Sequence, residues 1–146
     1  MREAGPVQGA SFADVAEGVR LALAQYTQAL DDGRTDDVVA TFCPDGSVEI
    51  PGMGTHTGHD ALRAAYTKWA PRLPQRHLVL NTVVGEWSDD EATAVSDVLF
   101  ILMGDAGWEI KLVGRYDDVL HRDGSSWRFH RRAATFVTEP PRKENT

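Results

Sequence analysis

Residues 108–137, WEIKLVGRYDDVLHRDGSSWRFHRRAATFV, decide the fold, because they predict two long strands joined by a tight turn at Asp123-Gly124. Residues 77–87 and 92–103, which come earlier in the chain, also have the composition of strands. The linkers between these four segments, SDDE, GDAG and DGSS, are short and polar, and most contain glycine. The sequence therefore predicts an antiparallel meander of four strands, at residues 77–87, 92–103, 108–121 and 127–137.

A long helix is predicted well before this meander, at residues 12–30. Ser11 can cap its start, and Gly33 suits the position just after its end. Apolar residues recur at steps of three and four, which gives one apolar stripe along the helix. The stripe consists of Val15, Val19, Leu23, Tyr26 and Leu30.

Two more helices are predicted between the long helix and the meander. The first covers residues 35–42 and is stopped by Pro44-Asp45-Gly46. A strand at 47–50 follows, and the glycine-rich turn after it lets the chain pair back as a brief hairpin. The other helix covers 59–69 and ends before Pro71.

Helices first and strands afterwards indicate an α+β fold, with three N-terminal helices packed on one face of a curved, mainly antiparallel sheet. Residues 11–137 are expected to form a single domain. The ends, residues 1–10 and 138–146, are polar and lack periodicity, so we expect them to be flexible.

Composition narrows the classes of partner and compartment. The 146 residues carry a formal net charge of −7, which disfavours nucleic acid, and no run of about 20 apolar residues could cross a membrane. A lone Cys43 allows no internal disulfide and suits a reducing compartment. No signal peptide is recognisable at the N-terminus. We therefore expect a cytoplasmic protein that binds neither nucleic acid nor membrane.

The predicted strand at 92–103 is apolar on both of its faces. One face is expected to pack against the helices or line a pocket, and the other to pack against a second copy of the chain. We therefore expect a homodimer or homotrimer. One set of alternating side chains is Val95, Leu99, Ile101 and Met103, and the other is Ala94, Val98, Phe100 and Leu102.

The order of four motifs, DDGRTDDVVATFCPDGSVEI, GTHTGHDAL, RHLVLN and GRYDDVLHRDGSSWRF, resembles the SnoaL-like branch of the nuclear-transport-factor-2-like (NTF2-like) superfamily over residues 12–137. Within that branch, the chain resembles two lyases, scytalone dehydratase and hexachlorocyclohexane dehydrochlorinase. The resemblance implies a cone-shaped half-barrel whose mouth opens between the long helix and the concave sheet face. Members include dehydratases, dehydrohalogenases, isomerases, cyclases, epoxide hydrolases and proteins without catalysis, so the fold alone leaves function open.

The resemblance also implies a catalytic pair. His77 stands where the lyases carry their catalytic histidine, and Asp31 stands where an aspartate orients it. Arg132 matches an arginine of the dehydrochlorinase, but Tyr26 replaces its cationic residue. Tyr26 cannot supply a fixed positive charge, which counts against dehydrohalogenation.

An imidazole held by a carboxylate is suited to removing a proton near neutral pH. We therefore expect a cofactor-independent lyase or dehydratase, isomerase or cyclase that acts on a small hydrophobic organic molecule, such as a polyketide or another natural-product intermediate. His77 would be the general base and Asp31 would orient it. The candidate substrate contacts are Tyr26, Asp97, Arg115, Tyr116, Arg132 and Asn81.

Several alternatives stay open. Tyr26 could be a plain core residue, Arg115 and Arg132 could be structural ion-pair partners, and Asp97 must be paired or face the pocket. A carboxylate pair of Asp31 with Asp97, or a Tyr–Asp pair, would favour an epoxide hydrolase or an epoxide-opening cyclase. A closed pocket would favour a non-catalytic binding or assembly module.

Metal and cofactor motifs are not recognisable in the sequence. His56 and His59 lie in a turn without a third ligand at a convincing spacing. The glycines of GMGTHTG do not have the spacing of a dinucleotide-binding loop. We therefore expect that the chain requires neither a metal nor a cofactor.

Overall fold

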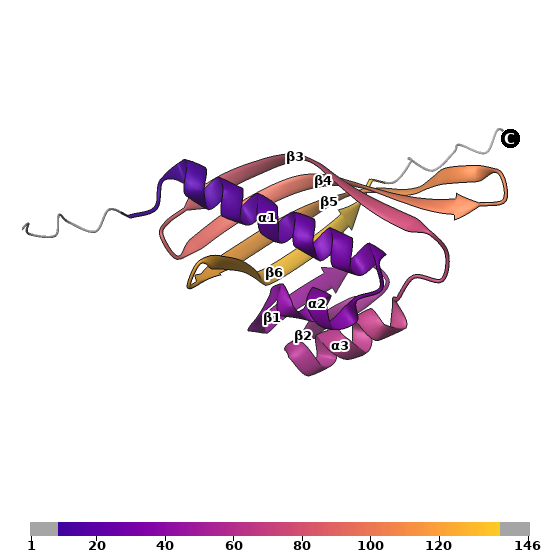
Figure 1. The fold of residues 1–146 in the computed structure, drawn as a ribbon, viewed down its shortest axis with the longest axis horizontal. Coiled ribbons are helices and arrows are strands. Elements are labelled where there is room, and N and C mark those ends of the chain that lie inside the picture. The colour runs from indigo at the N-terminus through magenta and orange to yellow at the C-terminus, as the bar shows by residue number, and fades with distance from the viewer. Residues whose placement is uncertain (1–8, 138–146) are drawn as a thin grey trace, which may run out of the picture.

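The computed structural model describes residues 9–137, and within this range it contains three helices and one six-stranded sheet (Figure 1). The predicted α+β fold is confirmed. The ends that were expected to be flexible lie outside the described residues, except for Gly9 and Ala10. The helices are α1 (Phe12–Asp31), α2 (Thr35–Ala40) and α3 (His59–Lys68); the strands are β1 (Phe42–Ile50), β2 (Gly54–Thr57), β3 (Gln75–Trp87), β4 (Glu91–Gly104), β5 (Gly107–Asp123) and β6 (Ser126–Phe136).

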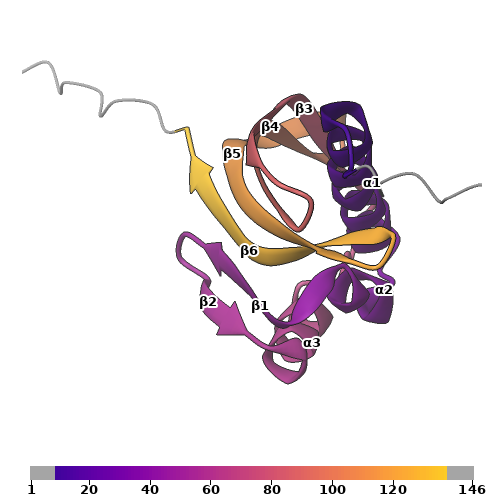
Figure 2. The ribbon, with the colours of Figure 1, turned by 90° about the vertical axis from the view of Figure 1, so that its left-hand side faces the viewer.

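The strands follow the order β2-β1-β6-β5-β4-β3. Neighbouring strands run antiparallel except β1 and β6, which are parallel, so β3 to β6 form the predicted meander. Figure 2 shows that the sheet is strongly curved and does not close. Helix α1 lies along its concave side, while α2 and α3 lie beside β1 and β2 (Figures 1 and 2).

Helix α1 forms where its sequence predicts it. Ser11 and Asp14 make a reciprocal capping box at its start, with two hydrogen bonds of 3.2 Å. All five residues of the predicted apolar stripe are buried against the concave face of the sheet. The helix approaches β6 so closely that a Cβ at Gly18 would lie 2.3 Å from Trp127 Cδ1. Glycine at this position therefore lets Trp127 pack directly on the helix backbone.

The core lies between α1 and the inner sheet surface. Its sheet side comes from β1 and from β3 to β6, and it includes Phe42, Val84, Ala94, Leu120 and Phe129. Among residues 9–137, no helix is both long enough and apolar enough to span a bilayer.

The prediction was wrong at the start of β1. Pro44-Asp45-Gly46 was expected to stop a helix at residue 42, but α2 ends at Ala40 and these three residues lie inside β1. The strand accommodates them by an irregularity in its pairing with β6, where the register shifts between Phe42 and Ser47. Such a bulge tolerates a proline because the bulged residues need not donate to the ladder.

Candidate active site

The end of α1 and the start of β3 meet at a carboxylate and an imidazole. Asp31 Oδ1 lies 2.6 Å from His77 Nδ1, and Asp31 Oδ2 accepts a 2.8 Å hydrogen bond from the His77 backbone N–H. The aspartate side chain is 3% exposed and the histidine side chain 16%. The structure thus brings together the two residues that the sequence placed in a pair, with the carboxylate buried and the imidazole accessible.

Gln75 completes this junction, although it was not among the residues predicted for the site. Its Nε2 donates a 3.2 Å hydrogen bond to Asp31 Oδ1, and its side chain is buried. Strand alternation places Gln75 and His77 on the same face of β3. The two-residue spacing before the predicted base was therefore a signal that could have found Gln75.

The geometry around Asp31 fixes the role of each nitrogen of the histidine ring. Because Nδ1–H donates to the Asp31 carboxylate, Nε2 keeps its lone pair and can accept a proton. The ring stacks on Phe100, with the centroids 4.7 Å apart and an interplanar angle of 25°. Asp31 and Phe100 together hold the imidazole in one orientation while leaving Nε2 available.

His77 lies in the wall of an apolar cavity of about 410 Å³ on the concave side of the sheet. A cavity of this size can hold a small organic molecule. The wall draws on helices α1 and α3 and on five strands. It consists of Tyr26, Leu30, Ile50, Met53, Tyr66, Trp69, Gln75, His77, Val98, Phe100, Leu112, Tyr116, Ala134 and Phe136.

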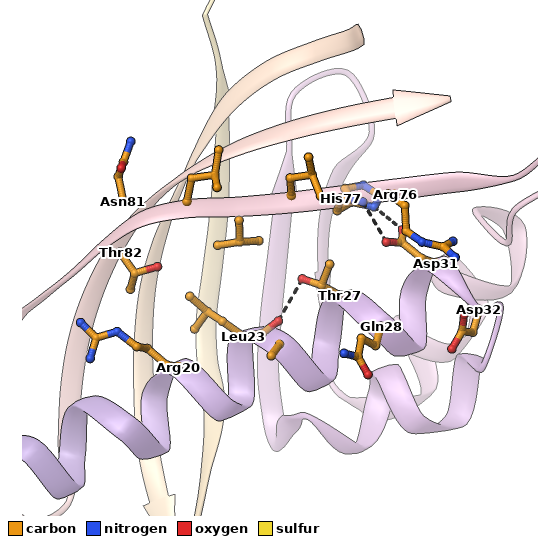
Figure 3. A pocket seen from close by; sticks show the side chains of 14 residues that line it. Arg20, Leu23, Thr27, Gln28, Asp31, Asp32, Arg76, His77, Asn81 and Thr82 are labelled. Carbon is orange, nitrogen blue, oxygen red and sulfur yellow. Dashed lines mark hydrogen bonds and ion pairs between the residues drawn. The ribbon is translucent and has the colours of Figure 1, made fainter. Parts of the chain in front are cut away.

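A second, larger hollow of about 830 Å³ lies on the other side of the pair, between α1 and β3. Figure 3 shows this groove, with Arg20 and Thr82 toward one end and Asp31, Asp32, Arg76 and His77 at the other. Its lining is rich in charged and amide groups, whereas the cavity is mostly aromatic and aliphatic. The cavity is the better candidate for an organic-ligand site, because an apolar wall with few polar groups is typical of such sites.

Three buried tyrosines, Tyr26, Tyr66 and Tyr116, form a cluster at the cavity wall. The hydroxyl oxygens of Tyr26 and Tyr66 lie 2.5 Å apart, and the rings of Tyr26 and Tyr116 meet edge to face at 6.5 Å. Burial raises the pKa of all three phenols. They therefore stay protonated at neutral pH and can donate hydrogen bonds.

Arg132 lies beneath this tyrosine cluster and does not line the cavity. Its Nε and Nη2 donate to the two oxygens of Asp118 at 2.9 and 3.1 Å, and both side chains are completely buried. The guanidinium carbon lies 3.7 Å from the centroid of the Tyr116 ring and 4.4 Å from that of Tyr26. Burial alone would lower the pKa of Arg132, but the Asp118 carboxylate outweighs it and raises that pKa. These contacts make Arg132 an ion-pair partner that supports the tyrosines from below.

The other three predicted contacts lie away from the cavity. Asp97 and Arg115 alternate with the cavity residues Val98 and Tyr116, so they lie on the outer face of the sheet. Arg115 Nη2 donates to Asp97 Oδ1 at 3.2 Å, and Asn81 Nδ2 donates to Asp97 Oδ2 at 2.9 Å. Hydrogen bonding from Asn81, together with Arg115, lowers the pKa of Asp97. The structure thus divides the predicted contacts: Tyr26 and Tyr116 lie with His77, and Asn81, Asp97 and Arg115 form a separate outer group.

Comparison with known proteins identifies relatives by both sequence and fold. The SnoaL-like domain family matches residues 13–133. A protein of unknown function from Mycobacterium tuberculosis superposes with a TM-score of 0.79 and 25% identity, over 84% of this chain and 72% of that chain. A candidate scytalone dehydratase from Novosphingobium aromaticivorans gives a TM-score of 0.75 and 23% identity, over 85% of both chains. An NTF2-like protein with a cystatin-like fold from the same organism gives 0.76 and 20%, over 84% of this chain and 81% of that one. A search of curated proteins finds no match.

Proposed function

The chain belongs to the SnoaL-like domain family, and on that premise we propose that it is a cofactor-independent acid–base enzyme for a small hydrophobic organic molecule. The observation that carries this proposal is the accessible His77 imidazole, held by the buried Asp31 carboxylate at 2.6 Å in the wall of an apolar cavity. General-base catalysis of this type contributes about 10²- to 10⁴-fold to the rate.

The cavity wall favours a flat, partly aromatic substrate that carries a carbonyl group. Aromatic side chains cover much of the wall, and the protonated hydroxyls of the tyrosine cluster can donate hydrogen bonds to a carbonyl oxygen. A polyketide or another natural-product intermediate has this chemistry. The candidate scytalone dehydratase among the structural neighbours supports lyase chemistry in particular.

For a β-hydroxy ketone the proposed steps balance without a cofactor. His77 Nε2 removes the proton next to the carbonyl, while a tyrosine hydroxyl hydrogen-bonds the developing enolate oxygen. The enolate then re-forms the carbonyl, a carbon–carbon double bond appears, and the β-hydroxyl leaves with the proton from the imidazolium as water. Asp31 stabilises the imidazolium between these two transfers. An isomerase or cyclase would use the same first step.

The alternatives receive less support. An epoxide hydrolase that uses Asp31 together with Asp97 would need both carboxylates in one site, and these two lie on opposite faces of the sheet. A non-catalytic module would be favoured by a closed cavity or by a histidine directed away from it. His77 instead contributes to the cavity wall.

Proton removal can be tested without knowing the complete reaction. Binders are first selected from a panel of cyclic and aromatic ketones by their increase of the melting temperature. Each binder is then incubated with the protein in deuterated water, and mass spectrometry follows deuterium uptake next to the carbonyl. We expect uptake with the natural protein and its loss in His77→Ala, while Arg76→Ala, a change at the neighbouring position, retains it. Binding without deuterium uptake for every ketone would contradict the proposed chemistry and support the binding-module alternative.

We also propose that the protein is a homodimer or homotrimer assembled through the outer sheet face. Large apolar side chains are exposed there on β3 and β5, among them Leu78, Leu80, Trp108, Ile110 and Val113. Multi-angle light scattering should give a dimeric or trimeric mass at micromolar concentration. Ile110→Glu should reduce it to the monomer mass, and Leu21→Glu, on the exposed side of α1, should not. A monomeric natural protein would contradict the assembly.

A further inference from the structure

A second cluster of reactive side chains lies in the part of the sheet where β6 runs between β1 and β5. Cys43 on β1, His121 on β5 and His130 on β6 each offer one potential ligand atom, and these atoms all lie within 4.8 Å of one another. None of the three lines the cavity or the groove beside α1. The cluster is therefore separate from the candidate active site.

Two irregularities in strand pairing bring these residues together. Between β1 and β6 the register moves from Phe42–Phe129 to Ser47–Arg131, so that residues 43–46 and His130 lie in a bulge. Between β5 and β6 it moves from Leu120–Phe129 to Val119–Arg131, so His130 is again the extra residue. Bulges commonly redirect a side chain at functional sites. Here both bulges share His130, and the β1 bulge also carries Cys43.

The polar contacts around the cluster resemble the surroundings of a metal site. His121 Nε2 lies 2.9 Å from Glu91 Oε2, and a carboxylate contact of this kind commonly orients a histidine that binds a metal. His130 Nδ1 is buried and has no hydrogen-bond partner among the described residues, with Asp45 Oδ1 3.9 Å away. The two imidazoles stack face to face, with centroids 4.2 Å apart and an interplanar angle of 11°. Because an imidazole nitrogen binds a metal in its own ring plane, one ring would turn for both to bind the same ion.

Cys43 supplies a weakly held sulfur. Its Sγ is 3.7 Å from the Arg128 carbonyl oxygen, a long hydrogen bond even for sulfur. Burial raises the pKa of this thiol, so it is protonated at neutral pH until a cation displaces the proton. The side chains of His121 and His130 are 37% and 40% exposed, which leaves an approach for an ion from solvent.

We propose that Cys43, His121 and His130 bind a divalent cation of borderline softness, Zn²⁺ in the first place. Zinc takes thiolate and imidazole ligands, whereas calcium and magnesium require mostly oxygen ligands. The Asp45 carboxylate or a water completes a tetrahedron. The ion would connect the bulge of β1 to β5 and β6, and it takes no part in proton removal at His77. No sequence spacing indicates this site, because its three residues come from three different strands.

Cobalt tests the proposal directly, because a Co²⁺–thiolate bond absorbs strongly in the near ultraviolet and a tetrahedral site gives visible bands. Full-length protein stripped with a chelator is titrated with Co²⁺ and, separately, with Zn²⁺ by calorimetry. We expect saturation at one ion per chain, both cobalt signals, and displacement of cobalt by zinc. No saturable binding, or bound cobalt without the thiolate band, would overturn the proposal.

Variants locate the site. Cys43→Ser should remove the thiolate band, His130→Asn should abolish one-to-one binding, and Glu91→Gln should weaken binding by about 10-fold or more. His56→Ala and His77→Ala are the matched controls, and each should bind zinc as the natural protein does. If His77→Ala lost the zinc while Cys43→Ser kept it, the ion would belong to the candidate active site and the proposal would be wrong. Circular dichroism of each variant separates loss of a ligand from loss of the fold.

Discussion

Two carboxylate pairs border the same group of tyrosines. In one, Asp31 holds His77 in the cavity wall; in the other, Asp118 holds Arg132 beneath Tyr26 and Tyr116. Their direct contacts are of similar length, 2.6 Å and 2.9 Å. They differ in access and in chemistry. The guanidinium is sealed from solvent and keeps its proton, while the imidazole is partly exposed at the cavity wall.

A short ion-pair distance therefore does not identify a catalytic pair. Arg132 had family support from the resemblance, as His77 did, yet it does not reach the cavity. A sealed pair can only support its neighbours, whereas a pair at a cavity wall can exchange protons with a bound molecule. Substitutions in the Asp31–His77 pair should therefore change the reaction rate, and substitutions in the Asp118–Arg132 pair should change the stability of the fold.

The largest effect is expected on the rate of deuterium uptake, at the accessible pair of Asp31 and His77. Asp31→Asn should reduce deuterium uptake by about 10²- to 10⁴-fold, because the amide no longer stabilises the imidazolium or fixes the ring tautomer. The rate of uptake into a bound ketone is the measurement, and binding by thermal shift should persist. Asp32→Asn, at the neighbouring exposed carboxylate, is the control and should keep the rate. Equal rates in both variants would remove Asp31 from the mechanism.

At the sealed pair of Asp118 and Arg132, we expect substitutions to lower the stability of the fold. Arg132→Met leaves the Asp118 carboxylate buried without its partner and should lower the free energy of unfolding in urea by about 3–5 kcal/mol. Arg131→Met breaks an exposed pair with Glu49 and should cost less than about 1 kcal/mol. Combining Arg132→Met with Asp118→Leu should recover much of the loss, since no buried charge then remains. No recovery in this double variant would mean that the charges themselves are required.

The tyrosines between the two pairs should control stability in alkali. Their folded pKa values lie above the value of about 10 in an unfolded chain. As the pH rises past about 10, the unfolded state releases phenol protons first, so the stability present below that pH declines by up to about 1.4 kcal/mol per pH unit for each tyrosine. Ultraviolet absorbance should show phenolate appearing together with unfolding. Tyr66→Phe should make the decline less steep, and phenolate formation in the folded protein would contradict this view.

The smallest effect is expected at the outer pair of Asp97 and Arg115. Because the folded pKa of Asp97 is lowered, its contribution to stability is present above the unfolded pKa and is lost as the pH falls through the folded value. Asp97→Asn should therefore make the melting temperature slightly less dependent on pH in the acid range. Asp105→Asn, in the turn between β4 and β5, is the control. A loss of deuterium uptake in Asp97→Asn would reveal a link between the two faces of the sheet.

Much of the fold could be predicted from local pattern. The stripe of α1, its capping box and the polar linkers of the meander are properties of neighbouring residues, and each formed as expected. Pro44-Asp45-Gly46 failed because the pattern of a turn is also the pattern of a bulge. Only the partner strand β6, more than 80 residues away, selects between them.

The candidate site was predictable to a different degree at each residue. His77 and Asp31 came from the family resemblance, and the structure brings them together. Asp97 was expected to be paired or to face the pocket, and it pairs with Arg115 on the outer face. Because apolar residues occupy both sides of β4, hydrophobicity could not indicate which face is concave. The cluster of Cys43, His121 and His130 was beyond reach, because bulges in two ladders create it.

Asp31 also closes a loop in the chain. Its hydrogen bonds to Gln75 and His77 tie the end of α1 to the start of β3, so residues 32–74 leave this junction and return to it. That excursion supplies Ile50, Met53, Tyr66 and Trp69 to the far wall of the cavity, while the proposed base and its orienting carboxylate lie at the junction itself. The chain thus separates the part that shapes the cavity from the part that would move the proton. Residues 32–74 form a cassette that evolution or design could exchange to alter the range of molecules admitted while keeping the same Asp31 and His77.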